Sequence, residues 1–263
     1  METGPVDETA SEVLVPLRET GTLPALFIVH GRLGQAFISP RFLELLGEEM
    51  PAWAFQARGL DGVHEPHATI EAMAADYVRA LRVRQPEGPY FLAALCAGAM
   101  IANVMARMLR DAGGALLPLL LLDPPEMRKR ASIADAALLN RIRGRRSQFA
   151  GSMDDPEYAT ASVRVARAFE MAIWEHEPVP YDGPVYVLSS RNRMGEGDSD
   201  YLSRLFTCIV GRVEVGAKHT DVLDPRNRVF AEHLTRFLAR ILAEAPRPIP
   251  ERASSIVRSA RSA

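Results

Sequence analysis

Residues 90–99 of this chain read Tyr90-Phe91-Leu92-Ala93-Ala94-Leu95-Cys96-Ala97-Gly98-Ala99. A short apolar run ends in a cysteine flanked by small residues, and the chain then becomes helical. This is the layout of a nucleophile elbow, usually G-x-S-x-G, in which a sharp strand-to-helix turn lifts the nucleophile above a sheet. Two positions depart from that pattern, because a cysteine replaces the serine and Ala94 replaces the first glycine.

Strands and helices alternate on both sides of this motif. Short apolar runs have the composition of strands that are buried on both faces of a parallel sheet. Besides the run before Cys96, the predicted strands are residues 25–29, 52–55, 116–122, 184–189 and 207–215. The predicted helices are residues 40–46, 69–84, 98–109 and 226–242. The alternation predicts an α/β fold with a mostly parallel central sheet flanked by helices.

The length and composition favour one large domain. The chain has 263 residues, of which 48% are apolar and 24% charged, and folds of this class commonly form a single unit at this length. We expect a flexible leader over residues 1–22, the α/β domain over 23–245, and a disordered tail over 246–263. Between residues 126 and 181 the alternation stops, and the helical sequence predicts a lid inserted into the domain.

Charge and cysteine content narrow the functional classes. A formal charge of −2 argues against a nucleic-acid-binding protein, for which a basic face is expected. The two cysteines, Cys96 and Cys208, form neither a disulfide framework nor a CxxC pair, and we expect no metal site. The acidic N-terminus lacks a secretory pattern, and the apolar runs are too short to cross a bilayer. A cytoplasmic protein is predicted, with Cys208 as a structural strand residue.

Three residues occur in the order nucleophile, acid and histidine that is typical of such an elbow. Cys96 ends one strand, Asp123 directly follows the next, and His219 lies in a loop before the last helix. Acyl transfer needs such a set, because a base takes the proton of the nucleophile and a carboxylate orients the base. The alternative acid position, after the strand at 184–189, offers no carboxylate before Glu196. The competing interpretations are a buried structural thiol at Cys96, a turn cap at Asp123 and an exposed loop residue at His219.

Backbone donors for an oxyanion are expected at two places. The segment His30-Gly31-Arg32-Leu33-Gly34-Gln35 follows a predicted strand, and its glycines permit a tight approach to the elbow. We predict one donor at the backbone N–H of Arg32 and a second at the N–H of Ala97, directly after the nucleophile. The positive end of the following helix would also favour a thiolate at Cys96.

Taken together, these features resemble the thioesterase domains that end non-ribosomal peptide and polyketide assembly lines, which have the α/β-hydrolase fold. The resemblance covers about residues 23–242. Besides the elbow, it rests on FIVHGRLG at 27–34, FQARGLDG at 55–62, QPEGPY at 85–90, Leu122-Asp123 and His219. It implies a Cys-His-Asp triad of the terminal type, a mobile lid over 126–181, no bound cofactor, and a substrate held on the phosphopantetheine arm of an acyl or peptidyl carrier protein.

The cysteine leaves several functions open. Most members of the family have serine at position 96, whereas cysteine occurs in relatives similar to β-lactone-forming thioesterases and in aminoacyl shuttles between carrier proteins. A thioester on Cys96 would be nearly isoenergetic with the incoming thioester, so the acyl group would stay activated for hydrolysis, cyclisation or transfer. A small-molecule hydrolase similar to dienelactone hydrolases and a non-catalytic binding protein are the competing hypotheses. The chain suits either a monomer or a domain of a synthase.

Overall fold

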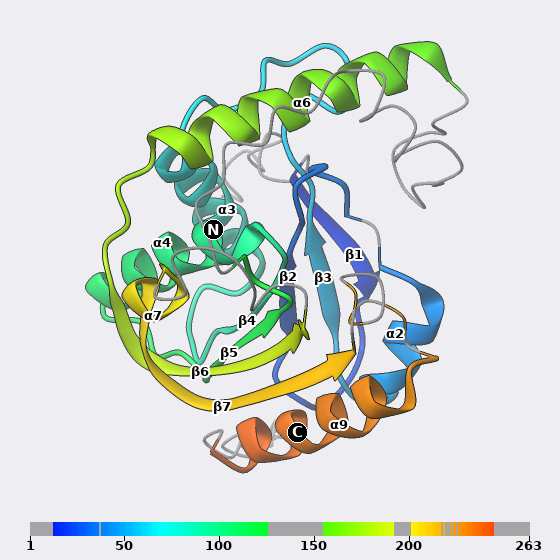
Figure 1. The fold of residues 1–263 in the computed structure, drawn as a ribbon, viewed down its shortest axis with the longest axis vertical. Coiled ribbons are helices and arrows are strands. Elements are labelled where there is room, and N and C mark those ends of the chain that lie inside the picture. Colours follow the sequence, from blue (N-terminus) through cyan, green and yellow to red (C-terminus); the bar gives the residue numbers. More distant parts are fainter. Residues whose placement is uncertain are drawn as a thin grey trace, which may run out of the picture.

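The computed structural model describes residues 13–36, 38–125, 155–191, 201–216 and 226–244, together with the single positions 218, 222 and 224. At its centre lies a seven-stranded sheet with the strand order β1-β3-β2-β4-β5-β6-β7 (Figure 1). The strands are β1 (Leu14–Arg18), β2 (Leu26–Val29), β3 (Ala52–Phe55), β4 (Phe91–Leu95), β5 (Leu119–Leu122), β6 (Tyr181–Ser190) and β7 (Phe206–Gly216). All neighbouring pairs from β3 to β7 are parallel, which confirms the predicted mostly parallel sheet.

The edge strand β1 corrects the predicted leader. Residues 14–18 pair with β3 in antiparallel register, for example Leu14 with Phe55, so the prediction of a flexible segment over 1–22 is wrong for these five residues. The strand contains Pro16, which lacks an amide proton and is tolerated best on an edge strand. Residues 1–12, and the predicted tail over 246–263, lie outside the described residues.

Helices cover both faces of the sheet (Figure 1). One face is packed by α3 (Ile70–Arg84) and α4 (Gly98–Asp111), and the other by α2 (Pro40–Leu45) and α9 (Arg228–Glu244). Successive side chains of a strand point to opposite faces, and neighbours in β2 accordingly enter different clusters, Phe27 the first and Ile28 the second. Within the described ranges, no helix has the length and apolarity needed to cross a membrane.

The segment predicted as a lid contains one long helix, α6 (Pro156–Glu175), which lies across one end of the molecule (Figure 1). Its N-cap is Asp155, whose carboxylate accepts a hydrogen bond from the N–H of Glu157. Two of its buried side chains, Val165 and Phe169, face the loop that follows β2. Residues 126–154 of the predicted lid lie outside the described residues, and position 181 already belongs to β6.

Most predicted boundaries agree with the structure to within a few residues. The strand predicted from position 116 begins at Leu119, because Leu116 makes only an isolated bridge to Tyr90. The short helix α7 (Tyr201–Leu205) was not predicted. Cys208 lies in β7, as expected for a strand residue.

Candidate active site

Cys96 occupies a sharp turn between β4 and α4. Its φ is 49°, in the left-handed region that non-glycine residues rarely adopt. The turn is held by a hydrogen bond of 2.8 Å from the Cys96 N–H to the carbonyl oxygen of Leu122, at the end of the neighbouring strand. The side chain is almost fully buried. The predicted strand-to-helix elbow is therefore present, with the thiol at its tip.

The small residues around the elbow are small for different structural reasons. A Cβ atom at Gly98 would lie 2.2 Å from the carbonyl oxygen of His30, a contact that no side chain can make. Gly31 sits against the nucleophile, since a Cβ atom there would lie 3.7 Å from the Cβ of Cys96. Ala94, by contrast, is a regular residue of β4 that pairs with Val29, and its methyl group packs in the core. The backbone therefore requires glycine at position 98 and accepts alanine at position 94.

Asp123 lies beside the elbow at the same edge of the sheet. The register pairs Leu95 with Leu122, so Cys96 and Asp123 directly follow paired residues of β4 and β5. Asp123 is fully buried and has a φ of 51°. Its carboxylate accepts hydrogen bonds from the N–H of Ser190 at 2.7 Å and from the hydroxyl of Ser190 at 3.2 Å. Charge-assisted bonds of this kind hold a carboxylate in one orientation.

His219 and the carboxylates considered as alternative acids, from Glu196 onward, lie outside the described residues. The strand before His219 is described, and β7 ends at Gly216, three positions earlier. The roles predicted for Cys96, Asp123 and His219 as a triad therefore remain predictions.

The predicted oxyanion segment packs between the elbow and α6. The guanidinium of Arg32 forms an ion pair with Glu170, with 2.8 Å between Nη1 and Oε1. Ala97 is the N-cap residue of α4, where the first amide protons of a helix have no partner within the helix. Both predicted backbone donors thus lie on segments that flank Cys96.

His30 lies at the end of β2. The sequence identified it only as the first residue of the predicted oxyanion segment. Its ring is buried, with 2.7 Å between Nδ1 and the carbonyl oxygen of Gly31 and 2.6 Å between Nε2 and the hydroxyl of Tyr77. Burial is the main cause that lowers the pKa of His30 from 6.5 to about 4, whereas the bond to Gly31 opposes it. His30 is therefore neutral at pH 7. The contact between Ser190 and Asp123 was likewise missed, because nothing in the sequence marks a pairing between ends of different strands.

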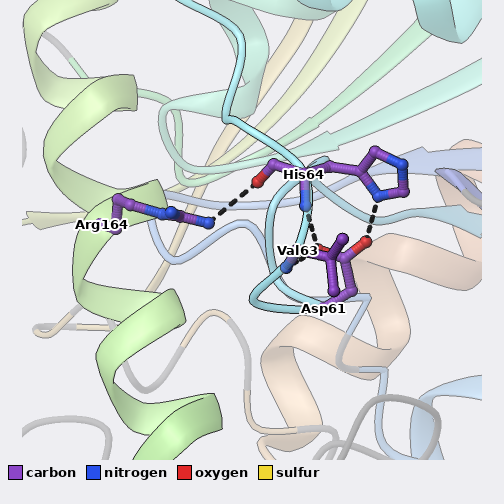
Figure 2. A network of polar contacts seen from close by, with 4 residues as sticks. All are labelled: Asp61, Val63, His64 and Arg164. Carbon is purple, nitrogen blue, oxygen red and sulfur yellow. Dashed lines mark hydrogen bonds and ion pairs between the residues drawn. The ribbon is translucent and has the colours of Figure 1, made fainter.

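A second group of polar contacts joins α6 to the loop after β3 (Figure 2). Arg164 donates a hydrogen bond of 2.9 Å to the carbonyl oxygen of His64, while Asp61 accepts bonds from the backbone N–H groups of Val63 and His64. A cavity of about 710 Å³ lies here, lined by Leu60, Val63, Tyr158 and Arg164 among others. Neither Cys96 nor Asp123 lines it, so this cavity is separate from the elbow.

Two solved thioesterases have a fold similar to that of this chain. The thioesterase domain of NocB from the nocardicin cluster has a TM-score of 0.66 and 22% identity, covering 86% of this chain and 99% of that domain. The type II thioesterase BorB from the borrelidin cluster has a TM-score of 0.68 and 19% identity, covering 88% of this chain and 97% of BorB. These similarities confirm the predicted α/β-hydrolase fold.

Parts of two curated synthetases have sequences similar to this chain. A dimodular nonribosomal peptide synthase of Bacillus subtilis (strain 168) is 35% identical over 116 residues, which are 44% of this chain and 5% of the synthase. Malpinin synthetase of Mortierella alpina is 30% identical over 125 residues, 48% of this chain and 2% of that protein. This chain therefore matches only a small part of each relative. The family profile described as "Thioesterase domain" matches residues 24–242, and the chain thus belongs to the thioesterase domain family.

Proposed function

We propose that this protein takes an acyl, aminoacyl or peptidyl group from the phosphopantetheine thioester of a carrier protein onto Cys96 and then releases it. The observation that carries the proposal is the strained elbow at Cys96, with the buried carboxylate of Asp123 directly beside it. Strained backbone conformations of this kind concentrate at functional sites. The similarity to parts of peptide synthetases supports a carrier-bound substrate.

The first half-reaction would load the enzyme. The Cys96 sulfur attacks the thioester carbonyl carbon while His219 takes the thiol proton. The N–H groups of Arg32 and Ala97 hold the negative oxygen of the tetrahedral intermediate. The bond between carbon and the phosphopantetheine sulfur then breaks, and that sulfur leaves with the proton from His219. Asp123 keeps the imidazole in the orientation that both transfers require.

The second half-reaction would release the acyl group. Water, an amine, a hydroxyl group of the acyl chain or another thiol gives its proton to His219 and attacks the carbonyl carbon of the acyl-Cys96 thioester. The bond to the Cys96 sulfur breaks, and the thiol recovers the proton. Because one thioester replaces another during loading, little free energy is lost, and transfer to an acceptor remains open beside hydrolysis and cyclisation. An aminoacyl shuttle between carrier proteins is one form of this reaction.

The proposal is tested by loading the protein from a panel of acylated carrier proteins and measuring its intact mass. Wild-type protein should gain the acyl mass, and Cys96→Ala should not. Cys208→Ala is the matched control, because it removes the other cysteine, in β7 and away from the elbow, and should load like the wild type. The proposal fails if Cys96→Ala still carries the adduct, or if the wild type loads from none of the carriers while hydrolysing free esters.

A further inference from the structure

Both ring nitrogens of the buried His30 are engaged. Nδ1 lies 2.7 Å from the carbonyl oxygen of Gly31, and Nε2 lies 2.6 Å from the hydroxyl oxygen of Tyr77. A carbonyl oxygen can only accept a hydrogen bond, so Nδ1 carries the proton and donates it to Gly31. In the neutral ring Nε2 is then an acceptor, and the Tyr77 hydroxyl donates to it. The tautomer is thereby fixed.

The bond to Gly31, together with a bond of 3.1 Å from the N–H of Gly34 to the same carbonyl oxygen, also fixes the direction of the next amide group. The peptide unit between Gly31 and Arg32 is planar, and in a trans peptide the carbonyl oxygen and the amide proton point in opposite directions. With its carbonyl held toward His30, this peptide turns the N–H of Arg32 away from the His30 ring. Gly31 itself touches the elbow, since a Cβ atom there would lie 3.7 Å from the Cβ of Cys96.

Neighbouring aromatic rings prevent the imidazole from turning. Phe169 of α6 meets the His30 ring edge-on, with 5.5 Å between ring centroids. Tyr77 is stacked on Phe55, with centroids 4.6 Å apart and ring planes within 12°. Burial raises the pKa of the Tyr77 hydroxyl well above its usual value, so it remains a donor at neutral pH. The hydrogen-bonded set of Tyr77, His30 and Gly31 is therefore held rigidly.

We propose that His30 is a positioning residue for the oxyanion hole, which orients the Gly31–Arg32 peptide as a donor while Tyr77 fixes the His30 tautomer. The inference rests on the proposed function, because it concerns the acylation of Cys96. His30 touches neither substrate nor thiol in this role. Its effect is exerted through a main-chain N–H, which every substitution of Arg32 other than proline leaves in place.

The test compares two reactions of the same thiol. Acylation by a thioester passes through an oxyanion, whereas alkylation by iodoacetamide displaces iodide at a tetrahedral carbon and forms none. His30→Leu should lower the rate of acyl loading by about 100-fold to 1000-fold, the loss typical of a missing oxyanion donor. The rate of Cys96 alkylation should stay within about twofold of the wild type. An equal fall in both rates, or no fall in loading, would overturn the inference.

Two conservative variants keep the inference testable if His30→Leu does not fold. His30→Asn places an amide donor near the position of Nδ1, whereas His30→Gln places it near Nε2, on the side of Tyr77. We expect His30→Asn to load at least tenfold faster than His30→Gln, with similar melting temperatures. Equal loading by the two variants would refute the positioning role. If wild-type protein is not loaded at all, the proposed function itself has failed; if wild type and His30→Gln load equally, only this inference has failed.

Discussion

Lowering the pH from about 7.5 to about 5 should destabilise the folded protein through His30. The ring is buried, and its pKa is about 4 in the folded chain against 6.5 ordinarily. Between these values the unfolded chain binds a proton that the folded chain does not, so stability is present above pH 6.5 and is lost as the pH falls toward 4. The largest loss of unfolding free energy that His30 can cause is about 3.4 kcal/mol, because a pKa difference of one corresponds to about 1.36 kcal/mol. At about pH 5 the linkage relation gives a loss of about 2 kcal/mol.

The carboxylate of Asp76, which contacts His67, contributes little in this pH window. Burial raises the pKa of Asp76, but hydrogen bonds from His67 and Arg79 outweigh that effect and hold the pKa below 3.8. The stability that Asp76 contributes is therefore lost only as the pH falls through 3.8 and below. A charged His67 adds to the penalty for protonating His30, which acts in the same direction as burial.

The measurement is urea unfolding, followed by tryptophan fluorescence, for wild type and His30→Asn at both pH values. Asparagine does not titrate here, so the change in unfolding free energy between the two pH values should be about 2 kcal/mol smaller in the variant. Every other ionisable side chain is common to the two proteins, so the difference between them isolates the contribution of His30. An identical pH dependence of the two proteins would refute the assignment of a buried neutral imidazole at position 30.

Three further substitutions test the site and the fold. Ser190→Ala keeps the N–H bond to Asp123 but removes the hydroxyl bond. Because a hydrogen bond to a charged group is worth about 1.5–3 kcal/mol, kcat/KM should fall about tenfold or more. Ser190→Thr should restore kcat/KM. Gly98→Ala would press a methyl group on the carbonyl oxygen of His30, and it should cost about 1–3 kcal/mol or more in a thermal melt. Thr69→Ala removes the side-chain cap of α3 and should cost about 0.5–2 kcal/mol, whereas Thr69→Ser should be nearly neutral in the same melt.

The parallel core was predictable because its strands carry their own signal. Runs such as Leu119–Leu122 are buried on both faces and are therefore apolar throughout. The edge strand β1 was missed because an edge needs no such pattern, and LVPLR contains a proline and a charged residue. Its place is decided by pairing with β3, a contact about 40 residues away in the sequence. The five residues of α7 are too few to show a helical period.

The same distinction applies to the candidate site. The positions of Cys96 and Asp123 followed from strand ends that the sequence marks, because parallel strands finish at one edge of the sheet. The hydrogen-bond partners of Asp123 and His30 could not be predicted in this way. Ser190 meets Asp123 across 67 positions, and Tyr77 meets His30 across 47. Such contacts depend on how neighbouring strands and helices are aligned, which local sequence patterns do not encode.

The loop after β2 is held to α6 mainly by apolar packing. The ion pair between Arg32 and Glu170 joins partly exposed side chains, and pairs of that kind contribute about 0–1 kcal/mol. Phe169, in contrast, is fully buried against His30, and burial of such a side chain stabilises by about 1.5–3 kcal/mol. Gly34 permits this close packing, because a Cβ atom at position 34 would lie only 2.6 Å from the side chain of Val165. The conformation of the proposed oxyanion segment therefore depends on the buried face of α6 more than on the ion pair at its margin.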